Sequence, residues 1–217
     1  MTRETAPRLF ASVDDAASLI SVMRASGPHD HRLLVGLAGA PGSGKSTVAT
    51  ELAERLEATV VLPMDGFHLP QARLVELGRR ERMGAPDTFD VDAFVALLES
   101  LRDVNNSGRT VLAPAFDRTI EEPVADGITL SPEVLTVIVE GNYLLLDSGG
   151  WERVAPLLDL TLGVELDEAT RHERLTARHI AYGKTPDAAR TWTLGPDEEN
   201  ARLVTASLSR ADALLRR

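Results

Sequence analysis

The 217-residue chain contains no cysteine, so it can form no disulfide framework and use no thiolate chemistry. It also lacks any stretch close to the roughly 18 apolar residues that span a bilayer. Residues 1–10 carry Pro7 and charges of both signs where a secretory signal would carry an apolar core. We therefore expect a soluble, cytoplasmic protein that does not bind a membrane.

Basic residues are few: the chain has 33 acidic residues and 23 lysines and arginines, which gives a formal net charge of −10. A surface that binds nucleic acid is normally basic, so the composition argues against nucleic-acid binding. The apolar fraction of 43 % is enough for a hydrophobic core. The length suits a single α/β domain over residues 1–217, while the oligomeric state stays open, a homodimer included.

Lysine is the scarcest charged residue, and one of the two lysines falls inside a phosphate-binding motif. These two are Lys45 and Lys184, and Lys45 belongs to residues 39–46, which fit the pattern G-x-x-x-x-G-K-[ST]. The motif follows an apolar segment, residues 33–38, and precedes an amphipathic one, residues 47–56. A strand, a glycine-rich turn and a helix in this order predict a P-loop, the phosphate cradle of nucleoside triphosphate-binding proteins.

The chemistry of such a loop follows from its backbone. Glycines let the loop wrap so that successive N–H groups point at a polyphosphate, and the helix N-terminus adds about half a positive charge. We expect Lys45 to reach the β- and γ-phosphates of ATP and the Ser46 hydroxyl to ligate Mg²⁺. The predicted nucleotide-binding residues are Gly39, Ala40, Pro41, Gly42, Ser43, Gly44, Lys45, Ser46 and Thr47.

Apolar runs alternate with amphipathic segments along the whole chain. Strands are expected at residues 33–38, 59–64, 110–113, 134–139 and 158–164, the last of these being the final strand. Helices are expected at about residues 12–25, 47–56, 92–104, 167–182 and 196–215, and an irregular excursion at 114–128. The alternation predicts the α/β P-loop NTPase fold, a mostly parallel, doubly wound sheet flanked by helices.

Two acidic residues stand at the carboxyl ends of expected strands, where parallel sheets bind ligands. Asp65 follows the strand at 59–64, and Glu140 follows the β-branched run at 134–139. One carboxylate can serve Mg²⁺ while the other accepts the proton of a hydroxyl that attacks the γ-phosphorus. The sequence leaves open which does which. We assign the base to Asp65 and count both carboxylates, with Ser46, as metal-ligand candidates.

The ordered motifs around these acids make the chain recognisable. They are Asp65-Gly66-Phe67, Arg82-Met83-Gly84-Ala85-Pro86-Asp87-Thr88-Phe89-Asp90, Pro114-Ala115-Phe116-Asp117 and Val139-Glu140-Gly141-Asn142-Tyr143. From about residue 33 to 204 the chain resembles the superfamily of phosphoribulokinase, uridine kinase and type I pantothenate kinase. The likeness is greatest to a branch labelled nucleoside/nucleotide kinase-like or fructose-transport-system kinase. Met83 departs from the pattern, because family members usually carry lysine there.

The resemblance implies transfer of the γ-phosphate of ATP to an alcohol under a helical lid at about residues 171–196. Arg171, Arg174 and Arg178 fall at i, i+3 and i+7 and so share one helix face. The last two are the ones that we expect to close over the transferring phosphoryl group. The predicted catalytic residues are then Lys45, Asp65, Glu140, Arg174 and Arg178.

The acceptor pocket is expected to draw on the same motifs, through His68, Arg82, Phe116, Asp117 and Tyr143. The cluster of Arg79, Arg80 and Arg82 favours an anionic or phosphorylated acceptor about as much as a plain basic turn. The acceptor class stays open among a sugar, a nucleoside, a pantothenate-like alcohol and a phosphorylated metabolite.

The leading hypothesis is therefore a kinase that phosphorylates an alcohol group of a small metabolite. A GTPase-type switch is disfavoured: residues 147–150 fit D-x-x-G, but no N-K-x-D motif exists in the sequence. The other alternative is a P-loop ATPase or a nucleotide-binding regulatory protein linked to transport, without an acceptor. An ADP-release assay with and without candidate alcohols separates these hypotheses.

Substituting Lys45→Ala should weaken phosphate binding and abolish turnover, because no other lysine lies in the motif. The measurement is ATP affinity together with steady-state ADP release. Turnover close to that of the unsubstituted protein would remove Lys45 from the mechanism.

Overall fold

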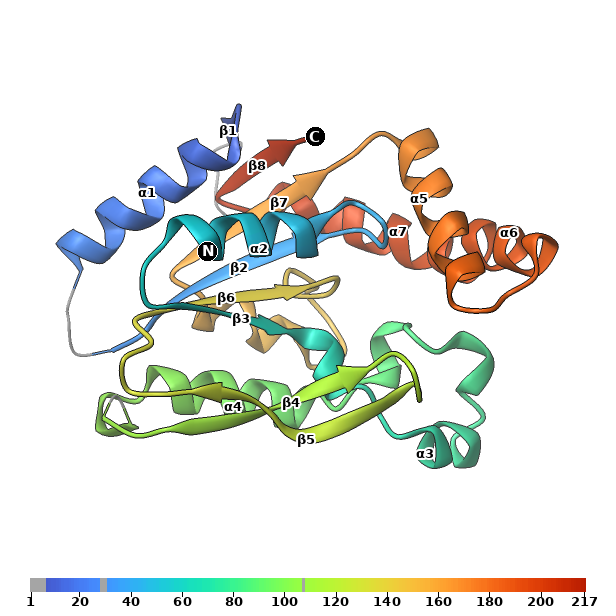
Figure 1. Cartoon of the computed structure of the whole chain (residues 1–217), viewed down its shortest axis with the longest axis horizontal. Helices are drawn as coiled ribbons and strands as arrows, with labels where there is room; N and C mark the ends of the chain where they lie inside the picture. Colours follow the sequence, from blue (N-terminus) through green and yellow to red (C-terminus); the bar gives the residue numbers. More distant parts are fainter. Residues whose placement is uncertain (1–6, 28–30, 107) are drawn as a thin grey trace.

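The centre of the molecule is a six-stranded parallel sheet in the order β1-β8-β7-β2-β6-β3. The computed structural model describes residues 7–27, 31–106 and 108–217. The strands are β1 (Arg8–Phe10), β2 (Leu33–Gly39), β3 (Thr59–Pro63), β6 (Thr136–Gly141), β7 (Leu160–Glu165) and β8 (Ala213–Arg216). The predicted α/β P-loop NTPase fold is thus confirmed, and Figure 1 shows the strands pointing toward the side where α5 and α6 lie.

Helices cover both faces of the sheet, which explains why the central strands are apolar at successive positions. Along β2, Val35 and Leu37 pack with α1 (Val13–Ser26) and α2 (Lys45–Arg55), and Figure 1 shows these two helices on one side of the sheet. Leu34 points to the opposite face, where the side chains of α4 (Val91–Arg102) and α7 (Pro196–Ser207) complete a second cluster. Successive side chains of a strand alternate between faces, so a strand covered on both sides reads as a continuous apolar run.

The irregular excursion expected at residues 114–128 is wrong, because the segment forms an antiparallel hairpin. Its strands are β4 (Val111–Asp117) and β5 (Glu122–Leu130), and their register shifts between Ala113 and Ala115. Most of β5 is exposed, so no apolar run marks it. Pro114 at the register shift has no N–H to donate and further masks the strand pattern.

The C-terminal segment also differs from expectation. The helix expected to reach residue 215 ends at Ser207, and β8 follows it after a short 3-10 turn. The apolar residues Leu208, Ala211 and Leu215 fall at i, i+3 and i+7, which is helical spacing and explains the error. The strand at residues 158–164 is therefore not the last one, and β8 pairs with both β7 and the three-residue β1.

The lid segment is a pair of helices after β7. Asp167 caps α5 (Glu168–Ala181) by accepting a hydrogen bond from the Thr170 N–H at 2.9 Å. The chain then turns at Gly183, whose φ is +93°, and enters α6 (Pro186–Leu194). The short helix α3 (Gln71–Glu76) lies near the hairpin tip, joined to it by hydrogen bonds from Gln71. Within the described residues, no helix combines the length and the apolar character needed to cross a membrane.

Gly66→Ala should destabilise the fold, because a Cβ at this position would lie 2.2 Å from the carbonyl oxygen of Pro114 in β4. A backbone atom cannot yield cheaply, so we expect a loss of about 1–3 kcal/mol in the free energy of unfolding. Urea denaturation measures it. The control is Gly108→Ala, where a Cβ would meet open space; equal stability of the two variants would contradict this packing.

Candidate active site

The register of three strands brings the P-loop and the two predicted carboxylates to one edge of the sheet. In β6, Glu140 pairs with Leu37 of β2, two residues before the P-loop begins at Gly39. On its other side Glu140 pairs with Pro63, two residues before Asp65. Since parallel strands end at the same edge, all three features meet where ligands bind in such sheets.

The P-loop adopts the conformation that its glycines were expected to permit. Gly42 and Gly44 have φ values of +79° and +88°, a region that favours glycine. The first hydrogen bond of α2 runs from the Val48 N–H to the Gly44 carbonyl at 3.0 Å. The N–H groups of the first helical turn therefore have no acceptor within the helix and are available to an anion.

The side chains that follow the loop meet Glu140. The Ser46 hydroxyl donates a hydrogen bond to Glu140 Oε1 at 3.0 Å. Burial raises the pKa of the Glu140 carboxyl, although the charge of Lys45 acts against this shift. Burial also lowers the pKa of the Lys45 ammonium, against the attraction of Glu140 and Asp65. The hydroxyl and the carboxylate thus form an oxygen donor pair beside a half-buried cation.

Asp65 has a different partner, one that the sequence did not indicate. Arg118, at the tip of the β4–β5 hairpin, donates a 2.6 Å charged hydrogen bond to Asp65 Oδ2. Burial would raise the pKa of Asp65, but the positive charges of His68, Arg118 and Lys45 outweigh it and lower the pKa. Burial lowers the pKa of His68, and the charge of Asp65 acts against this shift. Asp65 is therefore ionised at neutral pH.

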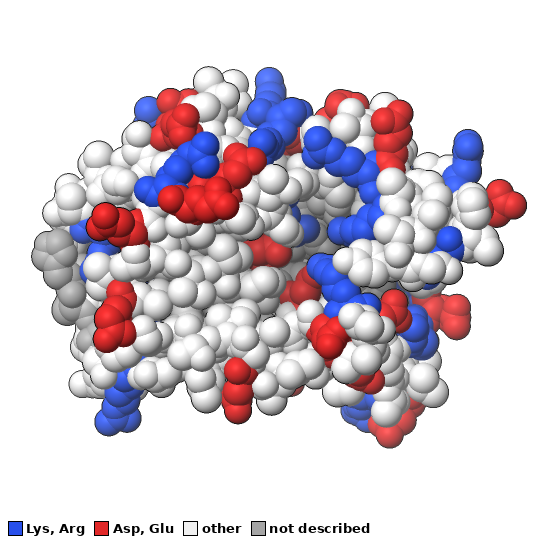
Figure 2. Space-filling view, in the orientation of Figure 1, with Lys and Arg blue, Asp and Glu red and all other residues white. Residues whose placement is uncertain are grey.

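A cavity of about 190 Å³, here called the inner cavity, lies between the sheet edge and the lid. Asp65, Glu140 and Arg118 line it from the body of the protein, and Lys184 lines it from the lid. Figure 2 shows a hollow on this side of the molecule, with basic side chains gathered along its rim and acidic ones deeper inside. Both carboxylates therefore face the same cavity as Arg118 of the hairpin and Lys184 of the lid.

A second space of about 310 Å³, the outer cavity, lies over the first turn of α2 and is lined by Thr47, Arg174 and Arg217 among others. Both cavities are lined by Lys45, Ser46 and Arg178. The two spaces therefore meet at the P-loop lysine, the P-loop serine and one arginine of the lid.

An aromatic wall closes one side of the inner cavity. The His68 ring lies 4.0 Å from the Phe89 ring and 4.8 Å from the Phe116 ring, measured between centroids. Its Nδ1 lies 2.9 Å from the Asp65 carbonyl oxygen. His68 and Phe116, both predicted for the acceptor pocket, are thus brought to the cavity and fixed in orientation.

The other three residues predicted for the acceptor pocket do not line the inner cavity. Arg82 is bound instead to the carboxylate of Asp87, and Asp117 Oδ1 accepts from the Thr119 N–H at 2.7 Å. Tyr143 is fully buried, and its hydroxyl donates to the Gly84 carbonyl. Arg82 and Asp117 are held by partners five and two residues along the chain, whereas Tyr143 binds a carbonyl 59 residues away.

Residues that the predictions left out take their place: Arg80, Arg118, Asn142, Lys184 and Asn200 line the inner cavity. For Lys184 a signal existed in the rarity of lysine, and for Arg80 in the arginine cluster. For Arg118 none existed, because the hairpin that carries it was not predicted.

The three lid arginines differ in burial and in their partners. Arg171 is buried, and its guanidinium pairs with Glu198 of α7. Arg174 and Arg178 are exposed, and neither forms an ion pair with a carboxylate in the described part of the chain. A Cβ built on Gly44 would lie 3.2 Å from Arg174 Nη1, so this guanidinium sits against the phosphate loop. Among the described residues, the two arginines predicted to be catalytic are thus the ones whose guanidinium groups are not bound to a carboxylate.

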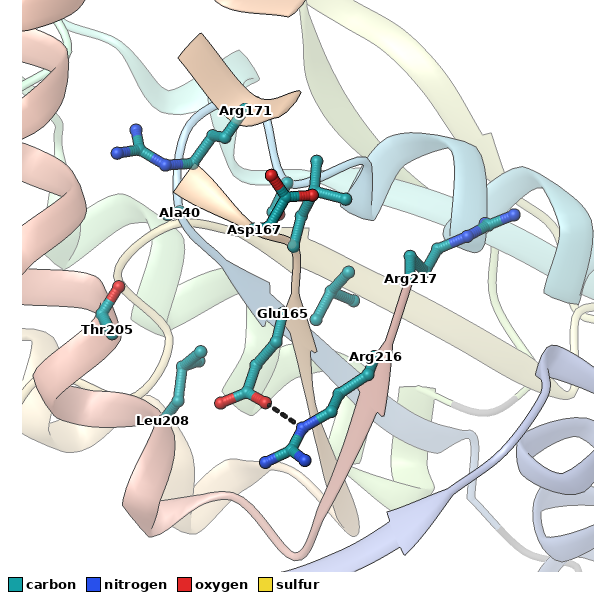
Figure 3. Close-up of a pocket in the computed structure, with 11 residues that line it drawn as sticks. Ala40, Glu165, Asp167, Arg171, Thr205, Leu208, Arg216 and Arg217 are labelled. Carbon is teal, nitrogen blue, oxygen red and sulfur yellow. Dashed lines mark hydrogen bonds and ion pairs between the residues drawn. The ribbon is translucent and has the colours of Figure 1, made fainter. Parts of the chain in front are cut away.

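A third cavity, of about 340 Å³, lies beside the ends of β7 and β8 (Figure 3). The figure shows Glu165 joined to Arg216, an ion pair of 2.9 Å, with Thr205 and Leu208 of the α7 side facing them. It shares Arg217 with the outer cavity and no residue with the inner one.

Comparison with known proteins shows the family to which this chain is related. Residues 34–217 match the phosphoribulokinase / uridine kinase family. A Schizosaccharomyces pombe protein named as a candidate uridine kinase is 37 % identical over 165 residues, 71 % of this chain and 69 % of that one. The uridine kinase of Clostridium perfringens is 30 % identical over 151 residues, 68 % of each chain. A crystal structure named for a proposed fructose transport system kinase from Silicibacter sp. TM1040 has a TM-score of 0.86 at 35 % identity, and covers 96 % of this chain and 100 % of that one.

The family match and the uridine kinase relatives, on a P-loop fold, define an ATP-dependent small-molecule kinase. More narrowly, the chain belongs to the phosphoribulokinase / uridine kinase family. The resemblance inferred from the ordered motifs is thereby confirmed.

Glu198→Gln should destabilise the protein, because it leaves the buried guanidinium of Arg171 without its charged acceptor. We expect a loss of roughly 2–3 kcal/mol in the free energy of unfolding at pH 7. Hydrogen bonds from His172 and Arg171 outweigh burial and lower the pKa of Glu198. A carboxyl with a lowered pKa stabilises the fold above its ordinary pKa and loses that contribution as pH falls.

The difference between Glu198→Gln and the parent protein should therefore shrink below about pH 4.3, the ordinary glutamate pKa. Chemical denaturation at several pH values measures it, with exposed Glu173→Gln on α5 as the control. A stability difference that does not change with pH would contradict the ion-pair explanation.

Proposed function

We propose that this kinase transfers the γ-phosphoryl group of ATP to a hydroxyl of a small metabolite, with Asp65 as the general base. The observation that carries the proposal is the junction of the two cavities at Lys45, Ser46 and Arg178. The triphosphate would lie along the P-loop in the outer cavity and present its last phosphoryl group at this junction. The acceptor would approach from the inner cavity, in line with the phosphorus.

The division of labour between the carboxylates follows from their partners. Glu140 accepts the Ser46 hydroxyl hydrogen bond, so it belongs with the serine that would ligate a metal. Asp65 stands on the acceptor side, next to the aromatic wall of His68 and Phe116. Its lowered pKa keeps it ionised, while burial raises the pKa of Glu140. Environments that push two carboxyl pKa values apart favour separate roles, and this supports Asp65 as the base.

The donor set fits magnesium. A serine hydroxyl and a carboxylate are hard oxygen ligands of the kind that Mg²⁺ takes when it also keeps water and phosphate oxygens. Ser46 and Glu140 would hold the ion, which when bound neutralises phosphate charge. Asp65 is bound to Arg118 instead of Ser46, so we assign the metal to the other two residues.

The lid would complete the site. Arg174 lies against Gly44, and Arg178 reaches the junction of the cavities. Planar guanidinium groups suit the charge that spreads over the equatorial oxygens of the transferring phosphoryl, and one such arginine can be worth 10³–10⁵ in rate. A lid closed over the inner cavity would also exclude water and so limit wasteful hydrolysis of ATP.

Asp65→Asn should leave the affinity for ATP close to that of the parent protein and lower kcat by about 10²–10⁴, because the hydroxyl proton loses its acceptor. The measurement is ATP-dependent phosphorylation of an acceptor found by screening a metabolite library with mass-spectrometric readout. The control is Asp92→Asn, a carboxylate exposed on α4 and away from the site.

Glu140→Gln should instead raise the Mg²⁺ concentration that gives half-maximal rate, by about 10–100-fold. A reversed pattern, with Asp65→Asn changing the Mg²⁺ requirement and Glu140→Gln sparing it, would exchange the two roles. ADP release that is identical with and without every alcohol in the library would overturn the kinase proposal and favour an ATPase.

A further inference from the structure

We propose that the acceptor carries an anionic group, a carboxylate or a phosphate, which Arg118 binds in place of Asp65. The inference rests on the proposed function and names the substrate class of the same site. It starts from an ion pair that places a guanidinium on the very carboxylate that has to receive the hydroxyl proton.

The pair between Arg118 and Asp65 is not needed to hold the hairpin in place. The hairpin tip is already bound by Arg80, which pairs with Glu121 at 2.9 Å, and by Gln71, whose Nε2 donates to the Glu121 carbonyl at 2.8 Å. The Arg118 side chain is 46 % exposed, and ion pairs of such exposure contribute little to stability. Its position inside the inner cavity therefore points to a role in binding.

The chemistry of Asp65 indicates what Arg118 does there. A carboxylate that is hydrogen-bonded to a guanidinium at 2.6 Å has one oxygen occupied and is a weaker proton acceptor. A neutral alcohol that enters the cavity offers Arg118 no better partner, so the pair persists and the base stays capped. An anionic acceptor offers a second charged partner, and Arg118 can turn to it and release Asp65.

A second cation faces the same space from the lid. The Lys184 ammonium lies 4.5 Å from the centre of the Trp192 ring, and within the described residues no carboxylate pairs with it. Both Lys184 and Arg118 line the inner cavity. Of the other lysines and arginines that line this cavity, Arg80 is paired with Glu121. Lys45 and Arg178 also line the outer cavity, where they face the triphosphate in the proposed mechanism.

Arg118 and Lys184 thus present charge from opposite sides, one from the body and one from the lid. An acceptor anion that contacts both would link the lid to the body at the moment when the base is released. Binding of the correct acceptor would then also release Asp65 from Arg118. A neutral alcohol of similar size would bind neither cation and would leave Asp65 paired.

The test compares matched acceptors that differ in charge: glycerol, glycerate and glycerol 3-phosphate; ribose and ribose 5-phosphate; pantothenol and pantothenate. Phosphate transfer from ATP is followed by mass spectrometry with saturating Mg²⁺. We expect an anionic member to exceed its neutral counterpart by at least about 10²-fold in kcat/KM, as for sites built to pair a particular polar group. The member that is accepted distinguishes a carboxylate from a phosphate.

Variants then assign the preference to Arg118. Arg118→Gln should raise KM for the anionic acceptor about 10–100-fold and narrow the gap to the neutral one, with KM for ATP unchanged within about twofold. Arg118→Lys should restore part of the loss, and Lys184→Gln should weaken the same acceptor. Arg73→Gln, an exposed arginine on α3 outside the cavity, should change nothing.

Equal kcat/KM for neutral and anionic members, or an unchanged acceptor KM in Arg118→Gln, would overturn this inference while leaving the kinase in place. ATP consumption that ignores every acceptor would instead overturn the proposed function, and this inference with it.

Discussion

The parallel pairing of β6 with β2 on one side and β3 on the other is the interaction on which the rest of this enzyme depends. It sets Glu140 level with both Leu37 and Pro63, and so brings the P-loop and two carboxylates to one edge although they are far apart in the sequence. A shift of the register by one residue would turn Glu140 to the other face of the sheet. Burial of β6 on both faces opposes such a shift, because Val137 and Ile138 belong to different apolar clusters.

At this edge of the sheet, the role of each charged side chain depends on its neighbours more than on its residue type. Of three arginines at helical spacing in α5, one is bound to Glu198, and the other two line the outer cavity without an ion pair to any described carboxylate. Of two carboxylates, one accepts from a hydroxyl and the other from a guanidinium. In a protein with a net charge of −10, binding of a polyanion rests on such local arrangements and on the helix N-terminus.

The sequence was informative where chemistry and structure are local. The P-loop, the central strands and the capped helices follow from patterns within about fifteen residues, and they agree with the structure. The β4–β5 hairpin and the paired β1 and β8 were missed because an exposed strand, a proline at a register shift and very short strands leave no periodic signal. The acceptor residues were harder still: Tyr143 and Arg82 turned to partners at Gly84 and Asp87. The Tyr143 contact spans 59 residues and so lies beyond any local pattern, whereas Asp87 stands in the same motif as Arg82.

The rarity of lysine has a consequence once the fold is known. Both lysines of the chain, Lys45 and Lys184, line the inner cavity, one on the phosphate loop and one on the lid. In the described residues, arginine and histidine serve the ion pairs, as on Glu51, Asp14 and Glu198, and lysine serves none. Acylation, carbamylation or any other reaction that seeks a side-chain amine therefore has no harmless place to occur on this enzyme. Such a modification would label the catalytic centre or inactivate it.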